Sequence, residues 1–266
     1  MSGDEKVMLA VSALLSLVLW GAWYIVPFRV RRIGRHGTGR RLLFSTPVIA
    51  AALLYLVLRT ASAHDVRDDP NYLVFYLLLG AAWVGFWIRS LAVTGISTRD
   101  DVVERRNESA AYAVAGAILA ITLCYAGGNI GDGPGWWVVV FSAVLSTVAL
   151  FAAWLLLEVV TDVSEVVTVD RDTSAGVRLA GFLVACGLML GRAVAGDWVS
   201  ADATVRDFIQ AGWPVVALLI LAAIVERALR PTPDHPRPAV VPYGLMPAMA
   251  YLFGAVYMVM RLGLPA

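Results

Sequence analysis

Long apolar runs separated by short polar stretches are the dominant pattern along this chain. Several of these runs reach the roughly 20 residues that an α-helix needs to cross the hydrocarbon core of a bilayer. The second run is short and the last contains Pro242 and Pro247, which leaves a count of seven to eight spans. The pattern predicts an all-α, polytopic transmembrane bundle of about eight helices. The runs lie roughly at residues 7–27, 42–58, 71–95, 109–127, 136–157, 174–195, 207–225 and 239–260.

The composition agrees with burial of most of the chain in lipid. Hydrophobic residues make up 59% of the sequence and charged residues only 15%, whereas soluble domains carry roughly 25% charged residues. The stretches between the runs are too short to hold a separate extramembrane domain. We therefore expect residues 1–266 to form a single transmembrane domain. The net charge of +1 gives no general attraction to nucleic acid.

Arginine collects in alternate loops, which predicts the orientation. The loop at 127–135, between the fourth and fifth runs, contains no arginine. Because positively charged loops stay cytoplasmic, we expect the odd-numbered loops inside, both termini outside, and a multi-pass location in the plasma (inner) membrane. The arginines of the first, third and seventh loops are Arg29, Arg31, Arg32, Arg35, Arg40, Arg41, Arg99, Arg105, Arg106, Arg227, Arg230 and Arg237.

A short motif recurs after 65 residues. Residues 106–110 read Arg-Asn-Glu-Ser-Ala at the start of the fourth run, and residues 171–175 read Arg-Asp-Thr-Ser-Ala at the start of the sixth. Both copies begin on the predicted cytoplasmic side, so the sequence predicts a parallel internal repeat of helix pairs. At the same offset, Ala115, Gly116 and Ala120 match Ala180, Gly181 and Ala185.

The repeated residues have clear local roles. Asn107 and Asp172 are expected to cap the two helices, since their side chains can accept hydrogen bonds from free backbone N–H groups. Two adjacent helix starts could also bind an anion, although the charge of Asp172 opposes that use. The pairs Gly116 with Ala120, and Gly181 with Ala185, follow the small-xxx-small spacing that lets helix backbones approach closely in lipid. We expect these faces to pack against other helices.

The motif also carries a family resemblance. Residues 106–111, Ala115-Gly116 and residues 172–176 resemble the YjfL-like bacterial inner-membrane family, also called domain of unknown function 350. The resemblance covers about residues 72–196. It implies a core at 71–196 of four spans in two related halves, with repeats starting near 106 and 171. It also implies a bacterial inner membrane, and no established activity.

The chain departs from the family at one motif position and extends beyond the core at both ends. Where the family usually keeps Asn in its second half, this chain has Asp172. Both residue types can cap a helix, so the capping role is retained. Residues 1–70 and 197–266 are expected to add flanking helix pairs.

One arginine is expected inside a span. Arg178 lies six residues after Asp172, about 9 Å into the helix at 1.5 Å per residue. It shares a face with Ser174 and Gly181, and Glu158 at the end of the fifth run is the nearest candidate partner. The two residues would form either a buried pair that lines a polar path or an interfacial pair whose charges reach water.

Other arginines are candidates for contact with lipid. Arg89 lies near the inner end of the third run, beside Trp83, Phe86 and Trp87. It would contact a substrate or a lipid headgroup, or it would simply anchor the span. The six arginines of the first loop approach the density of polybasic lipid-binding segments, although topology alone also accounts for them.

Residues for catalysis, cofactors or metals are not evident. His36, His64 and His235 all lie in expected loops, and Cys124 and Cys186 lie inside apolar runs. None has the spacing of a metal site. We therefore expect no catalytic, cofactor-binding or metal-binding residues, and no enzymatic activity.

The function expected from these features is that of a non-enzymatic membrane component, either a scaffold or a subunit of a complex. Its partners would be the lipid bilayer and either a second copy of the chain or other membrane subunits. The alternative is a small-solute or ion transporter or channel, because internal repeats are common in transporters.

Overall fold

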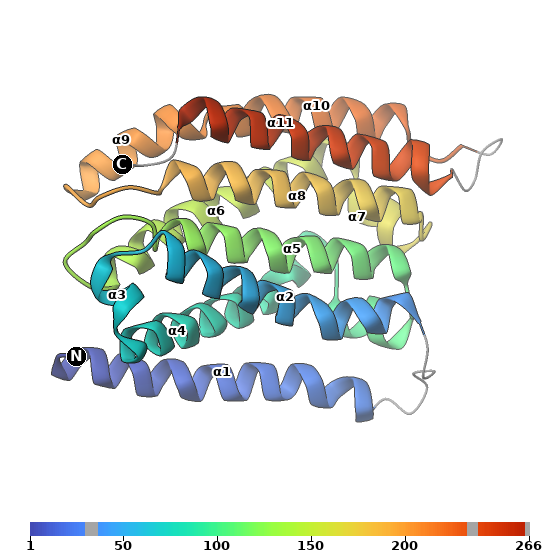
Figure 1. The fold of residues 1–266 in the computed structure, drawn as a ribbon. Helices are drawn as coiled ribbons and strands as arrows, with labels where there is room; N and C mark the ends of the chain where they lie inside the picture. Colours follow the sequence, from blue (N-terminus) through green and yellow to red (C-terminus); the bar gives the residue numbers. More distant parts are fainter. Residues whose placement is uncertain (30–36, 233–238, 264–266) are drawn as a thin grey trace.

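The computed structural model describes residues 1–29, 37–232 and 239–263, and these residues form helices and connecting turns without a strand. Eight helical stretches in this part of the chain are long and apolar enough to cross a membrane. They lie side by side, and consecutive spans along the chain run in opposite directions (Figure 1). The chain is thus an all-helical, multi-pass membrane protein in contact with lipid.

The helices that provide the spans have the following bounds. They are α1 (Gly3–Arg29), α2 (Thr38–Thr60), α4 (Pro70–Arg89), α5 (Glu108–Gly127), α6 (Trp136–Thr161), α8 (Thr173–Ala193), α9 (Ala201–Gly212) with α10 (Pro214–Ala228), and α11 (Met246–Leu262). The short elements are α3 (His64–Asp68), α7 (Val163–Thr168), the 3₁₀ helix η1 (Ser90–Thr94), and the π-helical turns η2 (Thr98–Glu104) and η3 (Val241–Leu245).

Helices α5 and α8 form the centre of the bundle. They run in the same direction and begin at the same end (Figure 1), which we call the Arg-rich end because Arg99, Arg105 and Arg171 lie there. The opposite end, with the loop at 127–135, is called the Gly-rich end. Most residues of both helices are buried, whereas α1 and α11 expose much of their surface to the surroundings. In a membrane, the outer helices therefore face the lipid and shield the central pair.

Small residues bring α5 and α8 into backbone contact. A Cβ atom at Gly116 would overlap the backbone of Ala180, and one at Gly187 would lie 2.7 Å from the Cα of Ala120. Gly127 meets Gly191 equally closely at the Gly-rich end. Because lipid offers no hydrophobic drive for helix association, this close contact supplies the dispersion energy that holds the pair.

The flanking helices pack in matching places on the two halves. Helix α2 packs on α5, and α11 packs on α8. The second contact again uses small residues, since a Cβ at Gly181 would meet Ala248 at 2.5 Å and one at Gly244 would meet Ser174 at 2.9 Å. The face of Gly181 therefore packs against α11. Ala185, on the same helix, is fully buried.

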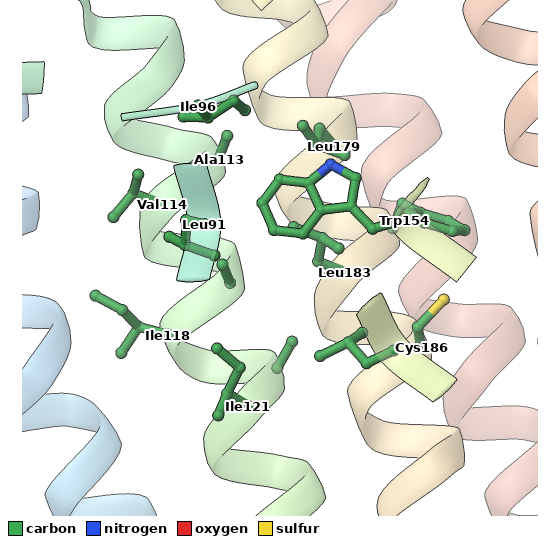
Figure 2. Packing of buried hydrophobic residues seen from close by; sticks show 14 of the residues in the cluster. Leu91, Ile96, Ala113, Val114, Ile118, Ile121, Trp154, Leu179, Leu183 and Cys186 are labelled. Carbon is green, nitrogen blue, oxygen red and sulfur yellow. The ribbon is translucent and has the colours of Figure 1, made fainter. Parts of the chain in front are cut away.

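The core around the central pair is filled with apolar side chains. Trp154 of α6 is 1% exposed, and its ring lies beside Leu179 and Leu183 of α8, with Ala113 of α5 across from them (Figure 2). Leu179 and Leu183 are fully buried as well. The middle of the bundle in this region is therefore closely packed with apolar side chains.

The last two spans are less regular than the apolar runs indicate. The run at 207–225 covers parts of two helices, because the chain breaks at Trp213 and restarts with Pro214 at the first position of α10. A proline lacks the N–H group that would continue the preceding helix. The eighth span starts with the π turn η3, which contains Pro242.

Candidate functional site

The most deeply buried charge in the described part of the bundle is Arg178, on the second turn of α8. Its side chain is 0% exposed. Nε donates to Oε1 of Glu226 at 2.8 Å, and Nη2 donates to Oε2 at 2.7 Å. This two-pronged geometry is the strongest form of an arginine–carboxylate pair. It joins α8 to α10 within the spans.

A backbone carbonyl completes the coordination of the guanidinium. Nη1 of Arg178 donates to the carbonyl oxygen of Tyr243 at 2.5 Å. Tyr243 lies in η3, four residues before Pro247. Because a proline has no N–H, it cannot form the usual helical hydrogen bond to the carbonyl four residues earlier. Pro247 therefore leaves the Tyr243 carbonyl available to Arg178, which links α8 to the start of α11.

Two further polar groups lie near the pair. The Tyr251 hydroxyl on α11 is close enough to interact electrostatically with both Arg178 and Glu226, yet it has no hydrogen-bond partner among the described residues. The Asp172 carboxylate is close enough to interact electrostatically with Glu226. A buried charge is costly unless it is paired and hydrogen-bonded. The three bonds of Arg178 meet that requirement inside the protein.

The expected pairing of Arg178 with Glu158 is wrong. The Glu158 carboxylate instead accepts hydrogen bonds from the backbone N–H of Ser164 at 2.8 Å and from its hydroxyl at 2.5 Å. These bonds close the turn between α6 and α7, where Asp162 is left-handed with φ 50°. Glu158 was the nearest acidic residue along the chain, whereas Glu226 is 48 residues away and reaches Arg178 only because α10 packs against α8.

Glu226 and Tyr243 were not expected at this site. In the sequence, Glu226 looks like a polar end group of the seventh run. One signal of its role was its position, because the seventh run ends and the eighth begins at the Arg-rich end, where α8 also starts. Pro247 was a second signal, because a proline inside an apolar run implies a free carbonyl four residues earlier.

The helix starts at the Arg-rich end form a second polar cluster, with both repeat residues acting as caps. The Asn107 side chain accepts from the N–H of Ala110 at 3.3 Å. The Asp172 carboxylate accepts from the N–H groups of Ser174 and Ala175 at 3.0 and 3.1 Å. The negative charge of Asp172 thus occupies the start of its own helix.

The two caps are connected across the bundle. The hydroxyl of Ser109 donates to the Asp172 carbonyl at 2.5 Å, and Nδ2 of Asn107 donates to the carbonyls of Val167 and Thr168 at 2.8 and 3.3 Å. An aspartate cannot donate, so Asp172 forms no such bond. The side chain of Asn107 therefore ties α5 to the end of α7, whereas the side chain of Asp172 caps α8 and only its backbone carbonyl bonds to α5.

The backbone before each cap has the same shape. Arg106 and Arg171 are left-handed, with φ of 55° and 56°. The N–H of Asn107 donates to the Asp101 carbonyl at 2.9 Å, and that of Asp172 donates to the Val166 carbonyl at 3.1 Å. The two bonds correspond to each other, because Asp101 and Asn107 lie 65 residues before Val166 and Asp172.

Three cavities among the described residues lie away from the ion pair. Their volumes are about 430, 320 and 460 Å³. None of the three is lined by Arg178, Glu226 or Glu158. The described residues also contain no group of three or more His, Cys, Asp or Glu side chains placed to hold a metal ion. His36 and His235, two of the three histidines, lie outside the described residues.

Taken together, the helical spans and the buried polar bonds between them define a polytopic α-helical membrane protein. Residues 61–194 match the model of the family described as Domain of Unknown Function (DUF350), which is about half of the chain. The chain belongs to this family. The match confirms the family expected from the motif, over nearly the same residues. No curated protein and no solved structure matched the chain.

The family boundary divides the ion pair. Arg178 lies within the matched residues, whereas Glu226 and Tyr243 lie beyond them. The matched part runs from the start of α3 to the end of α8, and α1, α2 and α9 to α11 are additional. Arg178 is thus one of the residues by which the family core binds the added helices α10 and α11, beside the Val160 carbonyl, which accepts from Arg227 of α10.

Proposed function

We propose that this protein is a non-enzymatic structural component of the plasma (inner) membrane, either a scaffold or a subunit of a membrane complex. The observation that carries the proposal is the use made of Arg178. Its side chain is fully buried, and its three hydrogen bonds go to neighbouring helices. Arg178, which would be the first candidate to line a polar path, thus connects helices instead.

The packing of the central helices supports the same conclusion. A transporter usually places its site between helices near the middle of the membrane, often where a helix is broken. Here α5 and α8 are continuous, and backbone contacts at Gly116 and Gly187 leave no space between them. The break at Trp213–Pro214 lies midway along the seventh span and η3 opens the eighth, so both interruptions belong to the added helices and not to the central pair. The core is therefore suited to rigidity.

The orientation belongs to the proposal as well. Most arginines at the described helix ends and loops lie at the end where α5 and α8 begin, and positive charge stays cytoplasmic. The exceptions toward the other end are Arg59, Arg67, Arg192, Arg206 and Arg261. We place the Arg-rich end in the cytoplasm and both termini outside. Arg31, Arg32, Arg35 and Arg237 also contribute to the sequence argument, but they lie outside the described residues.

An internal duplication accounts for the likeness of the two halves. The matched φ angles of Arg106 and Arg171, and the matched hydrogen bonds of Asn107 and Asp172, support a common origin. We infer that α4 with α5, and α6 with α8, descend from one helix pair. Such a pair would bury its small-residue face by association with a second copy, which is the arrangement expected of a packing module.

A two-part experiment tests the structural role. In the first part, purified protein is reconstituted in liposomes, and proton and potassium flux are compared with protein-free vesicles. Flux equal to the protein-free background is expected for wild type and for Arg178→Ala alike. Flux that exceeds this background and falls in Arg178→Ala or Glu226→Gln, but not in the control Arg230→Ala, would overturn the proposal.

The second part looks for the neighbours that a scaffold must have. A photoreactive amino acid is placed in cells at exposed apolar positions on different outer helices, such as Leu56 of α2, Ile220 of α10 and Phe253 of α11. At least one face is expected to give a protein adduct of defined mass, either a second copy or another subunit. Adducts to lipid alone at every position would contradict a scaffold role.

The alternative function, a small-solute or ion transporter, has one observation in its favour. A cavity of about 320 Å³ at the Gly-rich end is lined by the acidic residues Glu5, Asp65 and Asp132, and by the buried Asn129 and Ser142. Such a cavity could admit a cation from the outer side. The flux experiment distinguishes the two functions, because the transporter predicts conductance that depends on Glu5 or Asp65.

A further inference from the structure

A second cavity lies at the Arg-rich end and has a different chemistry. Its volume is about 430 Å³, within the usual range for small-molecule sites. Helices α1 and α4, the 3₁₀ helix η1 and the segment at 96–103 enclose most of it. The apolar lining includes Leu19, Trp20, Trp23, Ile88 and Leu91.

The charged side chains that line this cavity are both cationic. Arg89 and Arg99 line it, and no Asp or Glu does. Ser97 also lines it, but its hydroxyl is bonded to the Asp100 carboxylate at 3.0 Å. Arg89 is exposed, and its hydrogen bond from Nη2 to the Leu19 carbonyl is long at 3.5 Å. Arg99 shares one contact with the exposed Glu104 through Nε at 3.1 Å, which leaves its terminal nitrogens available. The side chains that line the cavity thus carry two positive charges and no negative charge.

A third polar group has no partner. The Thr98 hydroxyl is buried and makes no hydrogen bond among the described residues, and Thr98 lines the same cavity. Buried hydroxyls normally find a partner, because leaving one unsatisfied costs free energy. An oxygen-rich headgroup in the cavity would satisfy it.

The position of the cavity identifies the occupant as lipid. Trp20 and Trp23 donate their ring N–H groups to the carbonyls of Ala81 and Leu43 at 2.9 and 3.0 Å, so both rings are fixed. Trp20 also lines a second cavity, of about 460 Å³, which is almost entirely apolar and lies between α1, α2 and α4. A cavity with cationic side chains thus borders apolar space within the spans.

We propose that the cavity lined by Arg89, Thr98 and Arg99 binds an anionic phospholipid. The lipid phosphate lies between the two guanidinium groups and accepts from the Thr98 hydroxyl, while an acyl chain follows the apolar wall around Trp20. The inference does not depend on the scaffold role, because a transporter could carry the same site. Arg89 was a candidate for headgroup contact from the sequence, and the structure adds Thr98, Arg99 and the cavity itself.

The test uses purified protein in detergent with a photoactivatable phosphatidylglycerol analogue. A phosphatidylcholine analogue with the same chains is the control for charge. Labelling by phosphatidylglycerol is expected to exceed that by phosphatidylcholine, and to fall by roughly fivefold for each arginine removed in Arg89→Gln and Arg99→Gln. The variant Arg230→Gln, at the same end but outside the cavity, is expected to label like wild type.

A second pair of variants separates a cavity from a charged surface. Ala92 lines the cavity and is exposed, whereas the neighbouring Val93 is exposed but does not line it. Ala92→Trp is expected to fill the cavity and abolish the preference for phosphatidylglycerol, and Val93→Trp is expected to leave it unchanged. Equal labelling of these two variants, or equal labelling by the two lipids in wild type, would overturn the proposal.

Free phosphate is the remaining control. Millimolar inorganic phosphate is expected not to reduce the labelling, because the acyl chain contributes through the apolar wall. Competition by inorganic phosphate at this concentration would show a site for the free anion and would overturn the assignment to lipid.

Discussion

Arg178 and Glu226 form a two-pronged ion pair between α8 and α10, with N–O distances of 2.7 and 2.8 Å. The pair lies in the spans and is almost completely buried. It connects the part of the chain that matches the DUF350 family to the helices beyond it. Removal of one partner would therefore leave an isolated charge in an apolar environment.

Removal of Glu226 is expected to destabilise the bundle strongly. Glu226→Ala leaves Arg178 buried and unpaired, which costs about 3–5 kcal/mol in comparable cases. The free energy of unfolding, followed by circular dichroism during titration with a denaturing detergent, measures the loss. The control is Glu104→Ala, which breaks an exposed pair with Arg99 and is expected to cost at most about 1 kcal/mol.

A double variant checks the cause of that loss. Arg178→Met together with Glu226→Met removes both charges and retains side-chain volume, so the free energy of unfolding is expected to recover most of the way to wild type. If Glu226→Ala unfolded at the same detergent fraction as wild type, the ion pair would not hold α10 against α8.

Substitution of Gly116 is expected to push the central helices apart. A Cβ at this position would overlap the backbone of Ala180, so neither helix can give way by a side-chain rotation. Gly116→Ala is expected to cost about 1–3 kcal/mol of unfolding free energy. The control Gly254→Ala lies in α11, where a Cβ meets no atom within 4 Å, and its unfolding should match or slightly exceed wild type.

Exchange of Asn and Asp is expected to destabilise the protein more at Asn107 than at Asp172. Asn107→Asp removes the two hydrogen bonds to Val167 and Thr168 and places a carboxylate against their carbonyl oxygens, for an expected loss of about 1–3 kcal/mol. Asp172→Asn keeps an oxygen that can cap α8, so its expected loss is below about 1 kcal/mol. Thermal unfolding of the two variants in one detergent measures the difference, and equal losses would contradict the distinct bonding of Asn107.

The orientation of the bundle can be measured by cysteine labelling. We expect a membrane-impermeant maleimide to label Gly133→Cys, at the Gly-rich end, in intact cells. Asp170→Cys, at the Arg-rich end, is expected to react only after permeabilisation. Cys124 and Cys186 are fully buried, so the parent protein provides the unlabelled control. The opposite pattern would reverse the proposed topology.

Local sequence features were enough to predict the helical membrane architecture and the capping residues. A span depends on an unbroken apolar run, because lipid requires each backbone polar group to bond within its own helix. A cap depends on one side chain and the next three residues, which is why Asn107 and Asp172 were recognisable. Small residues at 116 and 181 predicted packing faces for the same reason, since spacing along a helix determines which residues share a side.

The partners of those faces were decided only by the tertiary structure. Gly116 meets α8 and Gly181 meets α11, although the two glycines occupy matching positions in the sequence. Arg178 had several carboxylates near its end of the bundle, and the packing of α10 selected Glu226 over Glu158. Hydrophobic periodicity reports which side of a helix is buried but not which helix covers it, because in lipid the energy of association comes from close contact between particular surfaces.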